Sequence, residues 1–347
     1  MTNSAATARA HVDAPPLSAL LVAFGAVLLA TIVISAGIGA VHIRASEVVR
    51  ALLHPSQAGE AGVILFSLRL PRVISAALVG AGLSATGVLF QGLFRNPLAD
   101  PFVLGASGGA ALGCAIAIFL FPALSVAGVS ASTAFAFCGA LATMAIVWSI
   151  AGRGNGAGIE NLLLAGFAVG TMLNAGTSAF EFTLEASNPG ARIVALWLYG
   201  QIGTPQWGQI AITCVLMLAA VLAALPLART LNTLALGDEY ASQLGVPVQR
   251  VRVQIVMLGA LLTALAVSLG GLIGFVGLLV PHVLRIVLGP DQFRLLPLSA
   301  LAGGAFLVIT DTAARSIFAP TEVPVGILTA FLGGPMFLYL LHKRRKS

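Results

Sequence analysis

Charged side chains are scarce in this chain of 347 residues, and the way they are grouped limits the chemistry that they can do. The longest polar passage is 229–252, in which Asp238 and Glu239 lie between flanking arginines. A second group, Asp311 and Arg315, is spaced i,i+4, so both side chains would lie on one face of a helix and could pair. Carboxylates and guanidinium groups arranged in this way bind opposite charges through short hydrogen bonds, which suits the holding of partners.

The motifs of a chain that performs its own covalent chemistry are missing from the sequence. There is no GxxxxGK[ST] phosphate-binding loop, and the only lysines, Lys343 and Lys346, lie in the C-terminal tail. No HExxH motif, Cys/His metal spacing or nucleophile elbow occurs, and the three cysteines lie in apolar runs typical of buried positions. We therefore expect no enzyme activity, metal site or cofactor in this chain, and the energy for its work should come from outside it.

The composition places the chain in a membrane. Hydrophobic residues make up 58% of it, charged residues make up 9%, and the mean hydropathy is +1.00. Soluble globular domains contain about 25% charged residues, so most of this surface cannot face water. Thirty-nine glycines fit closely packed helices in a bilayer, where small residues let backbones approach each other. A soluble enzyme and a disordered chain are both excluded.

We expect one all-α polytopic membrane domain over residues 1–347 with about ten transmembrane helices, because a spanning helix needs about 20 apolar residues. The expected spans are 17–41, 73–94, two in 102–152 with a turn near 121–130, 161–180, 209–228, two that begin at 253 with a glycine-rich break near 270–277, 295–318 and 323–341. Residues 193–207 are expected as a short helix or re-entrant piece, and residues 43–53 as an amphipathic helix on the membrane surface.

The distribution of Lys and Arg predicts the orientation. The basic tail 342–347 should be cytoplasmic, and ten spans then make residues 1–16 a cytoplasmic tail as well. On this arrangement twelve Lys and Arg lie inside and six lie outside, and the segment 229–252 is cytoplasmic. The net charge of +6 is therefore explained by membrane topology, and we expect no nucleic-acid partner.

Four stretches resemble motifs of the FecCD-type permease family, the membrane subunits of ABC importers for iron-siderophores, haem and cobalamin. They are 68–72 (LRLPR), 91–101 (QGLFRNPLADP), 274–282 (GFVGLLVPH) and 324–330 together with 333–335. The resemblance runs in order from about residue 65 to 341 and implies the type II ABC importer permease architecture. It also implies a homodimer with the pathway at its interface, two cytoplasmic ATPase subunits that carry ATP and Mg, a periplasmic substrate-binding protein and a bacterial inner membrane.

The resemblance also implies roles for particular residues. Arg69, Arg72 and Arg315 match arginines that hold acidic residues of the binding protein, although they could instead anchor helix ends at the lipid headgroups, and Asp311 competes for Arg315. Coupling to the ATPase is expected of a short helix and its flanking turn, namely Leu236, Gly237, Asp238, Glu239, Tyr240, Ala241, Leu244 and Gly245. Asn96, Pro97 and Leu98 are expected to help form a cytoplasmic gate, or simply to end a helix, since Pro97 disfavours the helical conformation at Asn96.

The substrate pathway is expected along residues 161–180 of both copies, where Gly166, Gly170 and Asn174 would give a face of small residues. Arg192 lies near the expected outer mouth and could attract an anionic ligand or anchor the chain at the interface.

For the cargo we favour haem or a ferric siderophore, and then cobalamin, by overall likeness. The rival function of another class is an ion-coupled secondary carrier, which would need a functional intramembrane acid such as Asp311 or Glu181. A membrane enzyme or receptor lacks any motif in its support.

Overall fold

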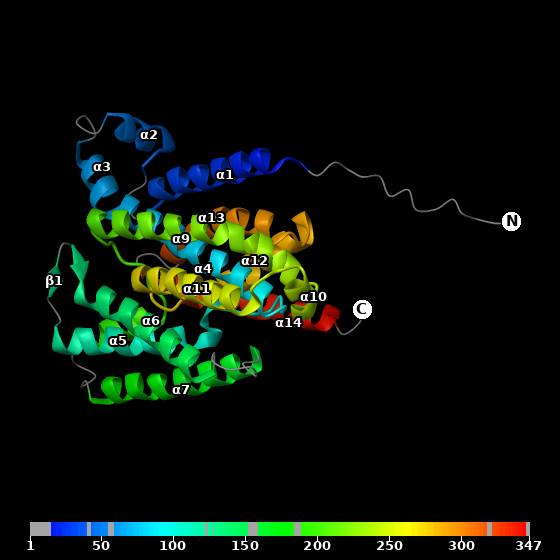
Figure 1. The fold of residues 1–347 in the computed structure, drawn as a ribbon. Coiled ribbons are helices and arrows are strands. Elements are labelled where there is room, and N and C mark those ends of the chain that lie inside the picture. The colour runs from blue at the N-terminus through cyan, green and yellow to red at the C-terminus, as the bar shows by residue number, and fades with distance from the viewer. Residues whose placement is uncertain are drawn as a thin grey trace.

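The computed structural model is almost entirely helical, with one two-residue hairpin (Figure 1). It describes residues 15–39, 43–54, 59–121, 124–126, 128–151, 159–183, 189–317 and 321–344. The elements are α1 (Leu17–Gly37), α2 (Ala45–Leu53), α3 (Gly59–Ile64), the π-helical η2 (Leu65–Arg69), α4 (Leu70–Leu93), the 3-10 helix η3 (Pro101–Leu104), α5 (Ala106–Leu120), β1 (Ser125–Val126), β2 (Val129–Ser130), α6 (Ala131–Ala151), α7 (Ile159–Thr183), α8 (Pro189–Leu198), α9 (Trp207–Leu234), α10 (Asp238–Gln243), α11 (Val248–Gly270), α12 (Val276–Leu288), α13 (Gln292–Ser316) and α14 (Val325–Arg344).

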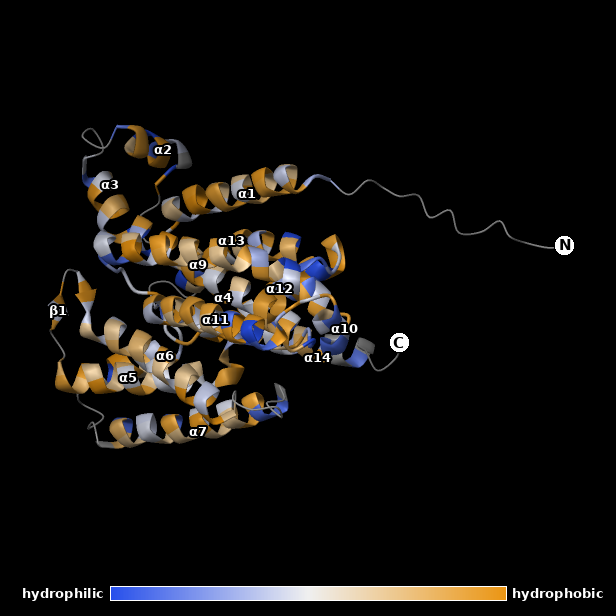
Figure 2. Ribbon diagram, viewed as in Figure 1, coloured by the Kyte–Doolittle hydropathy of each residue, from blue (hydrophilic) through white to orange (hydrophobic). Residues whose placement is uncertain are grey.

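The long helices form a bundle with two distinct ends, and both ends carry short surface elements (Figure 1). The α10 end holds the start of α1, the end of α9, helix α10 and the end of α14. The opposite end, called here the hairpin end, holds α2, α3 and the β1–β2 hairpin. Polar residues gather at the α10 end, while the bundle between the ends is mostly apolar (Figure 2).

Helix α4 is the centre of the bundle because its neighbours surround it. It packs against α9, α11, α12 and α13, and the most apolar part of its continuous span Gly59–Leu93 is 83% buried. Helix α1 packs on α13 at the edge, and none of its most apolar window is buried. Seven described helices are long and apolar enough to cross a membrane, and three further apolar helices are shorter.

Glycines set the closest helix contacts. A side chain at Gly80 would overlap the backbone of Gly303, and one at Gly87 would overlap the carbonyl oxygen of Gly277, so α4 touches α13 and α12 almost backbone to backbone. Gly109 and Gly139 bring α5 and α6 together in the same way. The high glycine content is therefore used for close packing, as the composition predicts.

The expected spans agree with the helices in most places. The turn expected near 121–130 is the β1–β2 hairpin, and the expected glycine-rich break is the turn at 271–275 between α11 and α12. The short helix expected near 193–207 is α8, and the surface helix expected at 43–53 is α2. The end of the expected span 295–318 and parts of both tails lie outside the described residues.

The part of the polar passage 229–252 that lies outside the long helices is shorter than the sequence indicates. Helix α9 continues to Leu234 and α11 begins at Val248, so both ends of the passage are extensions of long helices. Only residues 235–247 stand outside them, and α10 occupies the middle of that stretch. We call residues 235–247 the coupling segment below.

Candidate functional site

The coupling segment is a short helix held between two left-handed glycines. Gly237 has φ 122° before α10, and Gly245 has φ 81° after it, a conformation that residues with a Cβ rarely adopt. Between them Ala241 is completely buried and anchors α10 to the bundle. The position of this six-residue helix is thus set by three residues. Its two flanking turns need glycine, and its one buried position needs a small side chain.

An apolar stripe faces away from the bundle on the coupling segment. Leu236, Tyr240 and Leu244 are spaced i, i+4, i+8, and 66–68% of each is exposed. The stripe lies beyond the ends of the spanning helices α9 and α11, where a bilayer would not cover it. Large apolar side chains exposed together in water mark a surface for another protein. Tyr240 lies on α10, Leu236 precedes its first turn and Leu244 follows its last residue, so the three side chains surround the short helix.

Two arginines tie the coupling segment to the bundle through Asp238. One carboxylate oxygen of Asp238 pairs with Arg95 at the end of α4, and the other pairs with Arg252 on α11. The sequence interpretation gave Asp238 to a partner protein, whereas the structure has it bonded within the chain. A push on α10 would therefore reach α4 and α11 directly.

The residues expected to form a gate lie in a hydrogen-bonded turn that follows α4. Asn96 accepts a hydrogen bond from the Leu98 backbone N–H at 3.1 Å through its side-chain oxygen, and Arg95 has the left-handed φ of 48°. The Asn side chain supports a turn of this type, and Pro97 stops the helix. The turn adjoins the Arg95–Asp238 pair, so the expected gate and the coupling segment share one connection; the gating role itself stays a prediction.

Asp100 is a structural residue that the sequence interpretation quoted but gave no role. Its carboxylate accepts hydrogen bonds from the backbone N–H groups of Phe102, at 2.9 Å, and Phe275. Phe275 has the left-handed φ of 68°, so Asp100 stabilises the strained turn between α11 and α12. Burial raises the pKa of the Asp100 carboxyl, and the two N–H donors oppose part of that rise. The sequence feature that indicates this structural role is the Asp-Pro pair at the start of η3, since Asp is a preferred residue at helix N-termini.

A cluster of charges lies at the hairpin end of α4 and α13. Arg72 donates from Nε and Nη2 to both oxygens of Asp311 at 3.1–3.3 Å, and from Nη1 to Glu322 at 2.6 Å. Arg315 lies 3.3 Å from Asp311, which confirms that this i,i+4 pair forms. Asp311, one of the two acids that the rival carrier hypothesis names beside Glu181, is 2% exposed and paired with two arginines.

The side chains of the three candidate docking arginines are little exposed in this subunit. Arg69 is 7% exposed and donates to the backbone oxygens of Ala36 and Gly37 at 2.9 and 3.0 Å. Arg315 donates to the backbone oxygens of Ser35 and Ile38, both at 3.3 Å. Both arginines thus donate to carbonyls at the C-terminal end of α1, where a cation is favourable. Their docking role stays a prediction.

Helix α7 turns its expected pathway glycines inward. Gly166 and Gly170 are buried against η3 and Gly105, where an added side chain would meet backbone atoms. Asn174 and Arg192 are exposed, on α7 and α8 respectively. The two glycines therefore hold α7 onto the subunit, because the close approach leaves no room for a Cβ. The pathway role of α7 stays a prediction for its other, exposed face.

This arrangement defines a polytopic helical membrane protein with a short, exposed helix at one end of its bundle. The model of the FecCD transport family matches residues 27–343, and the chain belongs to that family. It is a permease of the ABC importer type.

The chain is similar to several named permeases. It is 46% identical over 286 residues to the cobalamin import system permease protein BtuC of Halobacterium salinarum, covering 82% of this chain and 74% of that protein. It is 40% identical over 285 residues to the hemin transport system permease protein HmuU of Yersinia pestis, with 82% and 84% covered. A solved structure described as an inward-facing conformation of a metal-chelate type ABC transporter aligns with a TM-score of 0.79 at 30% identity, covering 94% of this chain and all of the other.

Proposed function

We propose that this chain is the membrane subunit of an ATP-driven importer for a metal chelate, and that it works without chemistry of its own. The observation that carries the proposal is the coupling segment, a rigid helix with an exposed apolar stripe, ion-paired to two helices of the bundle. A separate ATPase that binds this stripe could move α4 and α11 as rigid bodies, which is a common route of switching.

The orientation follows from where the segment must meet ATP. If α10 is cytoplasmic, the start of α1 and the end of α14 are cytoplasmic too, since all lie at one end of the bundle (Figure 1). Seven long and three shorter apolar helices would then give ten crossings. The hairpin end, with the Arg72–Asp311 cluster, would face outward to a substrate-binding protein. A cysteine placed at Glu239 should react with an impermeant maleimide only from the ATP side, and reaction from the other side would contradict this orientation.

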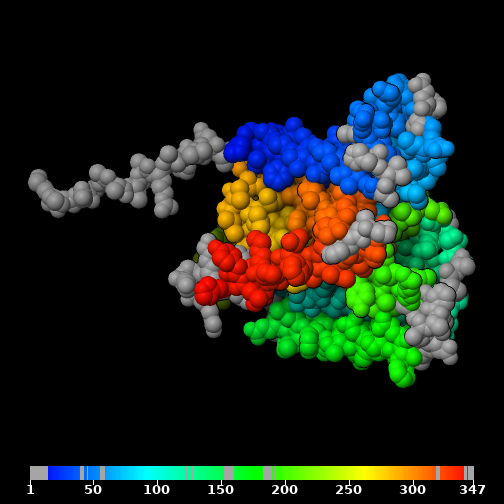
Figure 3. All heavy atoms as spheres, turned by 180° about the vertical axis from the view of Figure 1, so that it is seen from behind, coloured from blue at the N-terminus to red at the C-terminus, as the bar shows by residue number. Residues whose placement is uncertain are grey.

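A second copy of the chain completes the path in this proposal. Helices α7 and α14 both lie on the face seen in Figure 3. Both expose large apolar side chains, and among them Phe167 is 74% and Phe331 79% exposed. An apolar face can also contact lipid, so the support for a dimer here comes from the family resemblance.

The cargo proposed is a large chelate of the haem, cobalamin or ferric-siderophore class. Two relatives, at 46% and 40% identity, carry names that assign them to cobalamin and hemin, which favours a tetrapyrrole-like ligand. The test is uptake into proteoliposomes that contain this chain, its ATPase and its binding protein, with haem, cobalamin and a ferric siderophore supplied in turn. ATP-dependent accumulation of one chelate identifies the cargo, and accumulation of none contradicts the proposed function.

A further inference from the structure

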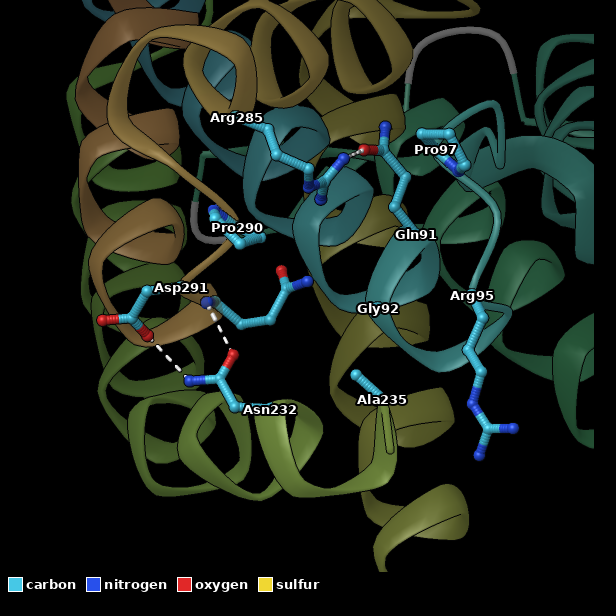
Figure 4. Close-up of a pocket in the computed structure, with 10 residues that line it drawn as sticks. Gln91, Gly92, Arg95, Pro97, Asn232, Ala235, Arg285, Pro290 and Asp291 are labelled. Carbon is cyan, nitrogen blue, oxygen red and sulfur yellow. Dashed lines mark hydrogen bonds between the residues drawn. The ribbon is translucent and has the colours of Figure 1, made fainter. Parts of the chain in front are cut away.

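A cavity of about 530 Å³ opens at the α10 end of the bundle (Figure 4). Its walls come from the ends of α4, α9 and α12 and from the start of α13, so four helices that are distant in sequence converge on it. The polar side chains that line it are Gln91, Arg95, Asn232, Arg285, Asp291 and Gln292. Neither the proposed docking of a binding protein nor the proposed coupling to an ATPase gives this cavity a role.

Arg285 brings an uncompensated positive charge to the cavity wall. Its Nη1 donates to the side-chain oxygen of Gln91 at 2.6 Å (Figure 4). Gln91 is itself fixed, because its amide donates to the backbone oxygens of Gly277 and Leu278 at 3.1 and 3.2 Å. Among the described residues Arg285 forms no ion pair, and its buried Nη2 has no hydrogen-bond partner. Such a cation is stabilised by an anion.

The surroundings of the cavity are positive as well. Arg95 shares the single carboxylate of Asp238 with Arg252, which leaves that trio with one excess positive charge. Arg229 stacks on the ring of Phe293 at 4.1 Å, beside the cavity, where it keeps its charge. Around the cavity and the coupling segment, six arginines (Arg95, Arg229, Arg250, Arg252, Arg285 and Arg294) outnumber three acids (Asp238, Glu239 and Asp291). Clefts lined by one sign of charge concentrate the opposite ion.

The opposite wall offers an acceptor that also lacks a partner. The side-chain oxygen of Gln292 is buried without a hydrogen bond among the described residues. Its neighbours are already engaged, since Asn232 donates to Asp291 at 2.7 Å and accepts from the Gln292 backbone N–H at 2.9 Å. A ligand that satisfies both walls therefore carries an anionic oxygen for Arg285 and a hydroxyl group for Gln292.

We propose that this cavity binds a phosphate group through Arg285, with Gln292 accepting a hydroxyl of the same ligand. Two sources share this chemistry: free phosphate in its singly or doubly protonated form, and the headgroup of an anionic phospholipid such as phosphatidylglycerol. Basic pockets between spanning helices bind anionic lipid headgroups in other membrane proteins. Bound phosphate would join α12 and α13 to the end of α4, next to the Arg95–Asp238 pair that holds the coupling segment.

The test uses the full chain alone, purified in a neutral detergent or placed in lipid nanodiscs. Thermal unfolding is followed while inorganic phosphate is titrated at constant ionic strength, and separately in phosphatidylcholine nanodiscs with increasing phosphatidylglycerol. Ligand that binds only the folded state raises the Tm in a saturable way. We expect that response for the wild type and for Arg250→Gln, which removes an exposed arginine at the same end outside the cavity lining. Arg285→Gln should weaken apparent binding at least tenfold.

A second variant keeps the test sharp if Arg285→Gln does not fold. Ala235 is exposed on the cavity wall, so Ala235→Glu places a fixed carboxylate near Arg285, and Ala235→Gln is the matched neutral control. The glutamate variant should lose the response and the glutamine variant should keep it. A response to phosphatidylglycerol alone identifies the lipid, and one to phosphate alone identifies the free ion. No saturable response, or an equal response in all variants, overturns the proposal, and neither result bears on ATP-driven import.

Discussion

At the scale of single residues, Asp311 is the acid that joins two arginines in the charge cluster of the hairpin end. Its replacement by asparagine would leave Arg72 and Arg315 buried around a neutral amide. Loss of one partner from a buried ion-pair network costs about 3–5 kcal/mol. We therefore expect Asp311→Asn to lower the free energy of unfolding by that order, measured by thermal or denaturant unfolding in detergent.

The matched control is Glu322→Gln, because Glu322 bonds to the same Arg72 but is 43% exposed. Exposed ion pairs contribute about 0–1 kcal/mol, so this variant should stay close to the wild type. Equal losses in both variants would show that burial of Asp311 does not determine its contribution.

Arg72 is the best placed of the three candidate docking arginines. Its Nη1 is bound to the exposed Glu322, and a carboxylate of the binding protein could replace that partner. We expect Arg72→Glu to weaken association of the binding protein at least tenfold, because it reverses the charge at the contact. Arg50→Glu, an exposed position on α2 at the same end, should have little effect in the same pull-down. Comparable loss in both would assign the effect to general charge.

At the scale of elements, close helix contacts depend on positions without a side chain. Gly87 meets Gly277 backbone to backbone, so Gly87→Ala forces α4 and α12 apart. Overpacking of this kind costs about 1–3 kcal/mol. Gly25 on α1 has open space around it, so Gly25→Ala should be neutral or slightly stabilising. Unfolding of the two variants in detergent measures the difference, and an unchanged Gly87→Ala protein would contradict the packing described here.

The coupling segment makes a prediction of its own. Replacement of Leu236, Tyr240 and Leu244 by serine removes the exposed apolar stripe and leaves buried Ala241 in place. We expect at least tenfold weaker ATPase binding in a pull-down, with a nearly unchanged Tm, because most of each stripe side chain is already exposed. Ser242→Ala alters an exposed position of the same helix outside the stripe and should bind normally. Retained binding by the serine variant would remove the stripe from the interface.

The elements were predictable from the sequence where one local pattern determines them. Apolar runs gave the long helices, glycines marked the turn between α11 and α12, and the i,i+4 spacing gave the Asp311–Arg315 pair. Contacts between distant elements were not predictable, because no local pattern encodes them. The burial of Arg69 under the end of α1, the capture of Asp238 by Arg95, and the inward turn of Gly166 all depend on how helices pack.

At the scale of the whole molecule, the two ends of the bundle divide the labour. The α10 end carries the coupling segment, which we propose binds the ATPase, and the hairpin end carries the cluster in which Arg72, Arg315, Asp311 and Glu322 pair with one another. Helix α4 runs between the two ends. Arg72, near its start, pairs with Asp311, and Arg95, just after its last residue, pairs with Asp238. We therefore expect a movement of the coupling segment to reach the hairpin end of the bundle through the buried helix α4.

The central claim is that the driving force reaches this chain from a separate ATPase. The most direct measurement is concentrative uptake of the cargo into liposomes that contain the chain and its binding protein, with and without the ATPase, under either ATP or a proton or sodium gradient. The account predicts accumulation only when ATPase and ATP are both present, and none with an ion gradient alone. Accumulation by the chain without ATPase, driven by an ion gradient, would contradict it.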